Sequence, residues 1–413
     1  MLNKFAKAIL ITVCTGFSLN LQLQANQSCY APGCERKCPP VACDPCKCTD
    51  RVWVDAEYLY WQIKNSPEPV PLVIQSATND PTLGSAGSTV VLGGNSINND
   101  WRSGGKISCG YWFDDARCFG VDASYFFLPS TSTRQSVSSS GLPGTSFLAI
   151  PFFNVTSAAE SSFVIANPDP LLHNGAYSAL AELKTRNQVQ GAELNGLMTF
   201  PCGCGLNMAV LAGFRYWNFN ESLNFTVNSP YLAYPEDVFT TIDKFDVQNN
   251  FYGGQLGVAF DYMYDCFFVN LKAKVALGAN CGRVDINGSL LTNEFNPVFS
   301  TGAPQSYIGG FFADPTNIGN HSKTLFSVIP EVNINIGYQI MDSLRLQVGY
   351  TFMYASNVLW AGKEIDSNLN TTQIPAIAFE PSPTLVGAPS PTPLTRTDGF
   401  WAQGVNVGLE FSF

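Results

Sequence analysis

The chain has little charge and almost no histidine. Asp, Glu, Lys and Arg make up 13% of its 413 residues, about half the usual share of a globular protein. Beyond the N-terminal segment, it has no apolar run long enough to cross a bilayer as a helix. The net charge of −10 argues against nucleic acid as a partner. Together with 35 glycines and 13% aromatic residues, these features favour a β-barrel or a large secreted β-sandwich over a cytosolic enzyme.

The N-terminus carries an export signal. Residues 1–25 begin with Lys4 and Lys7, continue through an apolar stretch and end at Leu23-Gln24-Ala25. This order is typical of a cleaved secretory signal peptide, although Leu23 is not the small residue preferred before the cut. We therefore expect a signal peptide over 1–25, a cysteine-rich periplasmic segment over 26–50 and a β-structured body over 51–413.

The last strand alternates strictly between two faces. One face carries bulky apolar side chains: Trp401, Val405, Val407, Leu409, Phe411 and Phe413. The other carries small or polar ones: Ala402, Gly404, Asn406, Gly408, Glu410 and Ser412. Bulky apolar residues outward and small polar residues inward suit the wall of a lipid-facing barrel. A terminal aromatic such as Phe413 is what the barrel assembly machinery of the outer membrane commonly receives.

The same period of two recurs along the chain with a consistent face. It predicts ten strands, each near the length that a tilted transmembrane strand needs. They cover 52–61, 105–113, 119–127, 188–198, 207–218, 251–264, 267–279, 326–340, 344–354 and 400–413. A single such segment would fit a soluble sheet equally well, but ten in phase favour an all-β, antiparallel up-and-down transmembrane barrel.

The connections alternate in length. Four are short turns, and five are long: 62–104, 128–187, 219–250, 280–325 and 355–399. A barrel with short periplasmic turns and long extracellular loops predicts this rhythm. Because structureless loops of that length are uncommon, 128–187 and 355–399 could each hide another hairpin, which would make twelve strands.

The presumed inner face carries charges of both signs. The candidate pore-lining residues are Asp55, Glu57, Lys106, Asp122, Glu193, Arg215, Lys272, Lys274, Glu331, Arg345 and Glu410. Such a lining fits either a water-filled pore or a narrow barrel whose acids and bases pair across the interior. Aromatic residues near the strand ends are expected to form interfacial girdles: Tyr58, Tyr60, Trp61, Tyr111, Phe127, Tyr264, Phe267, Tyr354 and Phe413.

Twelve cysteines follow the signal peptide, and six of them crowd into 29–48. They are Cys29, Cys34, Cys38, Cys43, Cys46 and Cys48, followed by Cys109, Cys118, Cys202, Cys204, Cys266 and Cys281. In an exported chain this density indicates disulfides, with a thiol metal site as the rival. The bonds would form within the chain or link it to neighbouring envelope proteins.

Motifs of enzymes are lacking. Gly203-Cys204-Gly205 has no phosphate-loop context, and there is no serine-centred nucleophile elbow. His173 and His321 fall in predicted loops without metal-ligand spacing. We expect neither an enzyme nor a bound metal or other cofactor.

Several segments carry a family resemblance. VWVDAEYLYWQIKN at Val52, GGKISCGYWFD at Gly104, FGVDASYFFL at Phe119, PFFNV at Pro151, KFDVQNNFYGGQLG at Lys244, LKAKVALG at Leu271, PEVNINIGYQI at Pro330 and FWAQGVNVGLEF at Phe400 resemble the putative beta-barrel porin family common in planctomycetes and found in some chlamydia-like bacteria. The resemblance covers 51–413 and implies an outer-membrane barrel. It brings no catalytic residues and does not cover the cysteine cluster.

Two functions are consistent with these observations. The first is a passive outer-membrane pore for small hydrophilic solutes. The second is a structural or surface protein of the cell envelope, with a closed barrel, disulfide links to its neighbours and loops used for adhesion. The polar inner face alone does not separate them.

Overall fold

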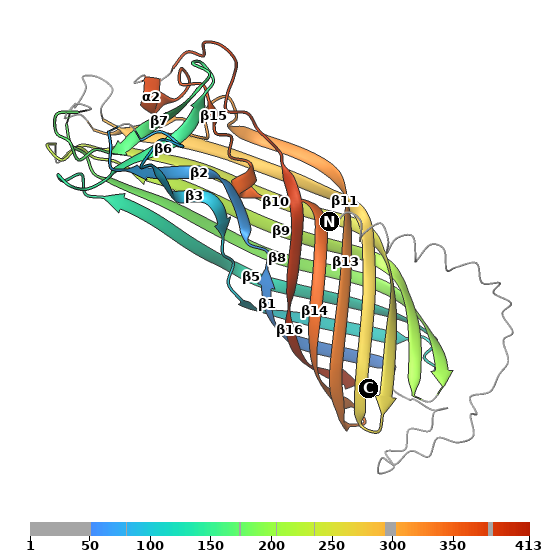
Figure 1. The fold of residues 1–413 in the computed structure, drawn as a ribbon. Coiled ribbons are helices and arrows are strands. Elements are labelled where there is room, and N and C mark those ends of the chain that lie inside the picture. The colour runs from blue at the N-terminus through green and yellow to red at the C-terminus, as the bar shows by residue number, and fades with distance from the viewer. Residues whose placement is uncertain are drawn as a thin grey trace.

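The computed structural model describes residues 51–79, 81–172, 175–203, 205–234, 236–293, 303–378 and 383–413. The predicted signal peptide and cysteine-rich segment therefore lie outside the described residues. The remainder forms a long antiparallel barrel with a second, smaller sheet at one end (Figure 1).

Ten strands close the barrel, as the sequence predicts. In chain order they are β1 (Val52–Ile63), β4 (Arg102–Trp112), β5 (Phe119–Ser139), β8 (Ala179–Gly203), β9 (Leu206–Asn228), β10 (Phe239–Tyr264), β11 (Phe267–Thr292), β13 (Gly319–Met341), β14 (Leu344–Leu359) and β16 (Thr397–Ser412). The first strand pairs with both β4 and the last strand, so that Val54 lies opposite Phe411. Because β10 also pairs with β11, the wall has no open edge.

Four short turns join neighbouring strands at one end of the barrel, where β16 also ends (Figure 1). The turn between β13 and β14 holds Asp342 and Ser343, and the one between β10 and β11 holds Asp265 and Cys266. Asp265 has a φ of 53°, a left-handed conformation that Asp tolerates better than most residues. These turns confirm the predicted hairpins.

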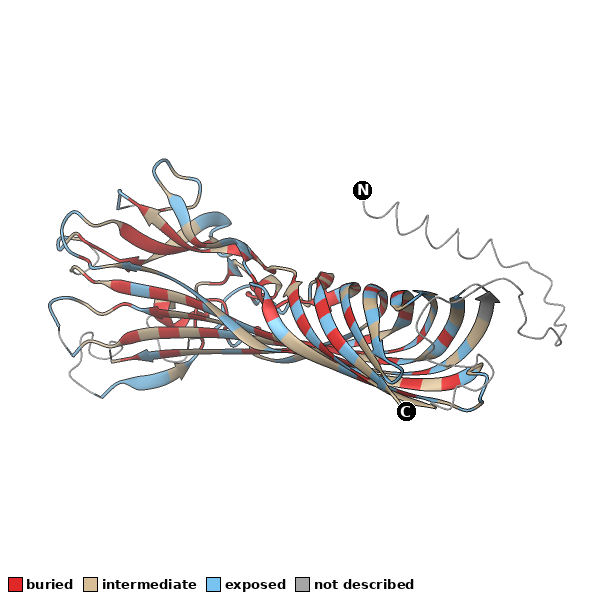
Figure 2. Ribbon diagram, turned by 90° about the horizontal axis from the view of Figure 1, so that it is seen from below, coloured by how far each residue is buried: buried red, intermediate tan, exposed pale blue. Residues whose placement is uncertain are grey.

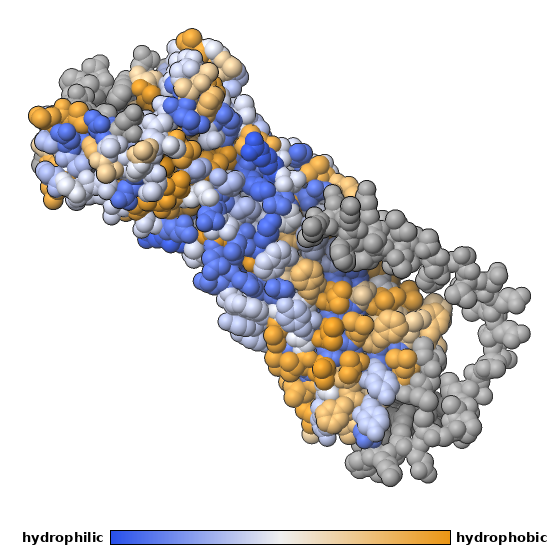
Figure 3. Space-filling view, in the orientation of Figure 1, coloured by the Kyte–Doolittle hydropathy of each residue, from blue (hydrophilic) through white to orange (hydrophobic). Residues whose placement is uncertain are grey.

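The lower half of the barrel carries an apolar outer band (Figure 3). Its exposed side chains include Leu194, Phe214, Leu256, Leu277 and Ile336. Exposed tyrosines bound the band on β10 at Tyr252 and Tyr262, ten residues apart (262 − 252). At about 3.4 Å per residue and a tilt of about 40°, this spacing spans roughly 26 Å. That is the height of the apolar band of outer-membrane barrels.

The strands continue well beyond this band. β8, β9, β10 and β11 are 25, 23, 26 and 26 residues long, more than twice what a membrane crossing needs. Their outer face above the band is polar, as at Arg186, Ser222 and Gln248, and Figure 3 shows a hydrophilic middle region there. Much of the chain that the sequence analysis predicts to be loop therefore forms strand with a polar outer face.

A second sheet covers the far end. It consists of β2 (Ser66–Ser76), β3 (Thr89–Ile97), β6 (Phe147–Asn154), β7 (Ala159–Ala166) and β15 (Asn368–Leu369). The antiparallel pair β6–β7 confirms a hairpin within 128–187. The strand count of twelve is nevertheless wrong, because this hairpin joins the second sheet and not the barrel wall. A short strand, β12 (Gln305–Ile308), pairs antiparallel with the outer end of β11.

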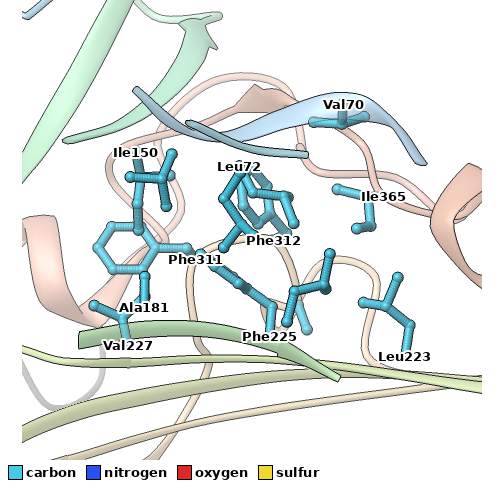
Figure 4. Packing of buried hydrophobic residues seen from close by; sticks show 14 of the residues in the cluster. Val70, Leu72, Ile150, Ala181, Leu223, Phe225, Val227, Phe311, Phe312 and Ile365 are labelled. Carbon is cyan, nitrogen blue, oxygen red and sulfur yellow. The ribbon is translucent and has the colours of Figure 1, made fainter. Parts of the chain in front are cut away.

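A dry core fills the space between the second sheet and the extended barrel strands. Phe311 and Phe312 lie between Phe225 of β9 and Leu72 of β2 (Figure 4), and all four side chains are fully buried. The short helix α2 (Pro375–Ala378) adds Ala376 to the same cluster. Figure 2 shows buried residues on both layers of this end. The outer end is thus a folded β-domain, here called the outer domain, and not a set of loose loops.

Among the described residues, no helix is long and apolar enough to cross a membrane.

Candidate functional site: the barrel interior

The barrel interior holds the charged residues that the sequence places there. Along β1, the burial alternates so that Asp55, Glu57 and Leu59 are buried while Tyr58 and Tyr60 are exposed. The same alternation holds on the other strands. It puts all eleven candidate lining residues on the inner side, buried or half-buried.

Four of these residues form a network that bridges the lumen, here called the ion-pair quartet. Lys274 of β11 lies 2.8 Å from a carboxylate oxygen of Glu193 and 2.9 Å from one of Glu331. Arg215 of β9 pairs with the same two carboxylates, at 3.5 Å from Glu193. Because β10 and β11 separate β9 from β13 in the wall, the Arg215–Glu331 pair crosses the interior instead of joining neighbours.

The quartet is electrically balanced and deeply buried. Two bases face two acids, and the side chain of Arg215 has no exposed surface. Gln255 donates to Glu193 at 3.0 Å and to Asn195 at 2.5 Å. Asn195 in turn donates to Asp122 at 2.8 Å. The hydrogen bonds continue the polar layer around the wall.

Nearer the end with the short turns, the remaining charges pair mainly between neighbouring strands. Lys106 lies 2.6 Å from Glu57, and Arg345 lies 3.3 Å from Glu410. Gln347 donates to Asp55 at 3.0 Å across β16. Lys272 is half-buried on β11. The structure thus groups most of the candidate residues into paired sets rather than leaving them around an open ring.

Directly above the quartet, an aromatic layer fills the lumen. Its members, each less than 8% exposed, are Trp61, Phe126, Trp217, Phe219, Trp360 and Phe400. They belong to one apolar cluster that draws residues from β1, β5, β8, β9, β10, β11, β13, β14 and β16. Ring centroids of Phe219 lie 4.9 Å from Trp360 and 5.0 Å from Phe400. Such spacings are typical of packed aromatic pairs.

Sequence reasoning missed this layer, and one prediction about it is wrong. Trp61 is not part of an interfacial girdle: it is 3% exposed and its indole donates to Asn406 at 2.7 Å. The reason is alternation, because Trp61 shares the inner face with Asp55 and Glu57. The sequence pattern that could have revealed the layer is the change of the inner face from polar to apolar residues. It occurs at Leu59-x-Trp61-x-Ile63 and at Trp217-x-Phe219.

A segment of the last long connection enters the barrel mouth. This plug segment, residues 357–364, comprises the last residues of β14, where Val358 and Leu359 still pair with β16, followed by Trp360 and the 3₁₀ turn η1 (Ala361–Lys363). Asn249 of β10 accepts a hydrogen bond from the Leu359 amide at 2.9 Å and donates to its carbonyl at 3.0 Å. Asn280 donates to the Asn357 carbonyl at 2.9 Å. β10 and β11 therefore bind the end of β14, from which Trp360 and η1 continue into the mouth.

Glycines on the inner face make room for these side chains. A Cβ at Gly349 would overlap the amide oxygen of Asn335, and one at Gly404 would overlap the ring of Trp61. Such close approach indicates a packed interior.

Within the described residues, no group of three or more His, Cys, Asp or Glu is arranged to hold a metal ion. Cys109 and Cys281 are exposed thiols on β4 and β11. The predicted disulfides of 29–48, Cys202 and Cys204 involve side chains that the structure does not describe, and cross-linking stays a prediction.

Comparison with known proteins gives a family match. Residues 53–413 match the family model described as putative beta barrel porin-7. No curated protein is similar enough in sequence to count as a match.

Solved structures with a related outline are distant. The outer membrane protease OmpT from Escherichia coli is 8% identical, with a TM-score of 0.37 over 88% of this chain and 97% of that one. A FadL homologue of Pseudomonas aeruginosa is 8% identical, with a TM-score of 0.22 over 88% and 90%. A deletion mutant of the monoaromatic hydrocarbon channel TodX is 7% identical, with a TM-score of 0.21 over 88% and 90%. At these scores, none of them carries an argument about this chain.

Proposed function

The chain belongs to the putative beta barrel porin-7 family, and on that premise we propose that it is a barrel with a closed lumen that carries a folded domain on the cell surface. The barrel lies in the outer membrane, as its family and its apolar outer band of about 26 Å require. Its short turns then face the periplasm and the outer domain faces the outside.

The filled interior supports the closed state. An aromatic layer lies directly against a balanced ion-pair quartet, and Arg215 at the centre of the quartet has no exposed surface. Barrels of about eight strands are usually filled by side chains, and ten strands lie near that class. A hydrated solute would have to displace both layers.

The passive pore remains the second candidate because the family is described as a porin family. Diffusion of small hydrophilic solutes would require movement of Trp360 and of the quartet. The extracellular mouth supports the first candidate, since the plug segment is hydrogen-bonded to β10 and β11. We propose no catalytic role, because the matching family is described by transport and not by a reaction.

Further partners follow from the same proposal. The apolar band would contact outer-membrane lipid, and Phe413 would be read by the barrel assembly machinery during insertion. Cys109 and Cys281 are exposed thiols. They are available for links to neighbouring envelope proteins, as is the predicted cysteine-rich segment.

Surface display and solute flux test the proposal together. A peptide tag inserted after Gly144, a turn residue with open space around it, should bind antibody on intact cells. The same tag between Asp342 and Ser343 should bind only after permeabilisation. Liposomes holding the wild-type protein should not swell in small sugars faster than empty liposomes. Rapid swelling would contradict the closed barrel and favour the pore. A Gly144 tag that binds no antibody on intact cells would contradict the proposed orientation.

A further inference from the structure

We propose that the carboxyl groups of Glu68 and Glu221 form a proton-controlled latch, which holds the plug segment in the barrel mouth while the pair is protonated at least once and releases it when both ionise. The inference rests on the proposed closed state and adds its regulation.

Glu221 joins three parts of the molecule. It lies on β9, is 3% exposed, and is five residues beyond Tyr216, which pairs with Tyr252 at the edge of the apolar band (221 − 216). One carboxylate oxygen accepts a hydrogen bond from the Ser66 hydroxyl of β2 at 2.5 Å. The other accepts one from the Ala361 amide of the plug segment at 2.9 Å. A single side chain therefore ties the barrel wall to both β2 and the plug.

Glu68 lies against the same turn of the plug. It is 1% exposed, and no side chain of the described residues donates to its carboxyl oxygens; the Val70 amide is the group that interacts with them. A Cβ at Gly362 would overlap one of these oxygens. The plug backbone thus covers the Glu68 carboxyl directly. Ionisation of the Glu68 carboxyl is unfavourable while the mouth is closed, because water cannot reach the charge there.

The bases on the surrounding elements are engaged elsewhere. Arg102 of β4 donates to Asn187 at 2.7 Å. Lys363 of the plug and Lys64 after β1 both pair with Asp398 of β16, at 2.8 and 3.0 Å. In the described part of the chain, neither Glu68 nor Glu221 has an ion pair.

Two other acids face this region and are bound differently. Glu364 of the plug accepts hydrogen bonds from the amides of Thr395 and Arg396 at 2.7 and 3.0 Å. Asp243 of β10 accepts three amide hydrogen bonds from residues 311–313. Asp243 binds residues 311–313 and not the plug, whereas burial raises the pKa of Glu364 to about 7, so that Glu364 adds to the pH dependence of the plug. The Lys363–Asp398 pair also joins the plug to β16, but although burial opposes it, hydrogen bonds from Lys363 and Lys64 lower the pKa of Asp398 to about 2, so this pair stays charged above pH 4.

Charge repulsion gives the latch its direction. Burial raises the pKa of Glu221 to about 7. Burial and the neighbouring Glu221 raise the pKa of Glu68 well above its usual range. An acid whose pKa is raised in the closed state stabilises that state at low pH and loses this contribution as the pH rises through the raised value. The plug is therefore latched in acid and released in alkali.

The neutral contacts of the plug do not change with pH in this range. Asn249, Asn280 and the packed ring of Trp360 hold it at all values. Release is consequently an equilibrium that shifts with pH, and its slope reports how many protons are lost.

Hydrogen exchange of the full-length protein in nanodiscs tests the latch. After correction for intrinsic exchange, protection of the peptide covering 357–364 should be greatest near pH 4, below the ordinary pKa of both carboxyl groups. As the pH rises from there toward the raised pKa values, protection should fall by about tenfold per pH unit for each carboxyl that is still protonated in the closed state, and it should then level off. The double variant Glu68→Gln/Glu221→Gln keeps the shape of the protonated pair, and it should lose the share of the pH dependence that these two carboxyl groups contribute. A shallower slope from Glu364, whose pKa burial raises to about 7, should remain. Glu160→Gln, on an exposed position of β7, should behave like the wild type.

Three outcomes would overturn the latch. They are protection that does not change with pH, a pH-dependent loss that is as steep in the double variant as in the wild type, and a loss at pH 6 on adding a chelator, which would assign the pocket to a metal ion. Heat-modifiable migration on gels verifies that each variant is folded. Conductance at pH 6 would contradict the closed lumen itself. A barrel that does not conduct but whose plug protection is insensitive to pH would contradict only the latch.

Discussion

At the scale of the residue, the interior depends on charges that cancel. Arg215 faces Glu193 and Glu331, and its side chain is fully buried. Removing one member of such a group leaves a buried charge without compensation. Loss of the buried arginine should therefore lower the stability of the protein far more than loss of an arginine from a surface ion pair.

We expect Arg215→Ala to destabilise the barrel by roughly 3–5 kcal/mol, because two buried carboxylates would share only Lys274. Urea unfolding in lipid vesicles, followed by tryptophan fluorescence, measures the change. Arg134→Ala is the matched control. Arg134 pairs with Glu182 at the surface with 68% of its side chain exposed, so it should cost less than about 1 kcal/mol. Equal effects would contradict the buried network.

Asp243 gives a pH-dependent prediction for the outer domain. Burial raises its pKa from 3.8 to about 6, although the amides of Phe311, Phe312 and Ala313 hydrogen-bond to it. Its contribution is complete below about pH 4 and is lost as the pH rises through 6. The shift corresponds to about 3 kcal/mol.

Asp243→Asn should remove this share of the pH dependence. Urea unfolding of the outer domain at pH 4 and pH 7 should show a smaller loss on raising the pH for the variant than for the wild type. An identical loss in both would mean that Asp243 does not contribute.

At the scale of the element, one strand passes through different surroundings. On β10, Leu256 points outward within the apolar band, and Gln248 points outward above it. The same substitution on the same face should therefore have opposite consequences at the two heights.

Leu256→Arg should destabilise the barrel by about 2–4 kcal/mol, the cost of a cation near the middle of the bilayer. Gln248→Arg should be within about 0.5 kcal/mol of the wild type, as is usual at a water-facing position. The folded fraction after refolding into vesicles of defined lipid gives both values. A tolerated arginine at 256 would place the membrane band elsewhere.

The strands and their faces were predictable from the sequence because lipid imposes a simple rule. Every outward residue in the band must be apolar, so Val405, Val407 and Leu409 alternate with small or polar neighbours. The short turns were predictable for a related reason. Each of them interrupts the alternation between two neighbouring segments whose apolar residues lie on the same face.

The aromatic layer and the outer domain were not predictable in the same way. An inward Trp217 or Phe219 has the same local pattern as an outward residue near a strand end, and only the register decides its side. β2 contains Pro67, Pro69 and Pro71, which normally argue against a strand. It pairs with the next strand, β3, and also with β6, which is more than seventy residues away in sequence (149 − 74 = 75).

At the scale of the whole molecule, the barrel and the outer domain are continuous. The same four strands, β8 to β11, form the membrane wall below and one layer of the outer core above. The plug segment lies at the junction of the two parts. The lumen and the surface domain are therefore coupled through the mouth of the barrel.

The central claim is that the lumen is closed, and conductance in planar bilayers tests it most directly. Wild-type protein inserted at pH 6 should give no conductance steps. A variant with glycine at positions 215, 217, 219 and 360, which removes Arg215, Trp217, Phe219 and Trp360, should give them under the same conditions. Regular steps from the wild type, similar in size to those of this variant, would contradict the claim.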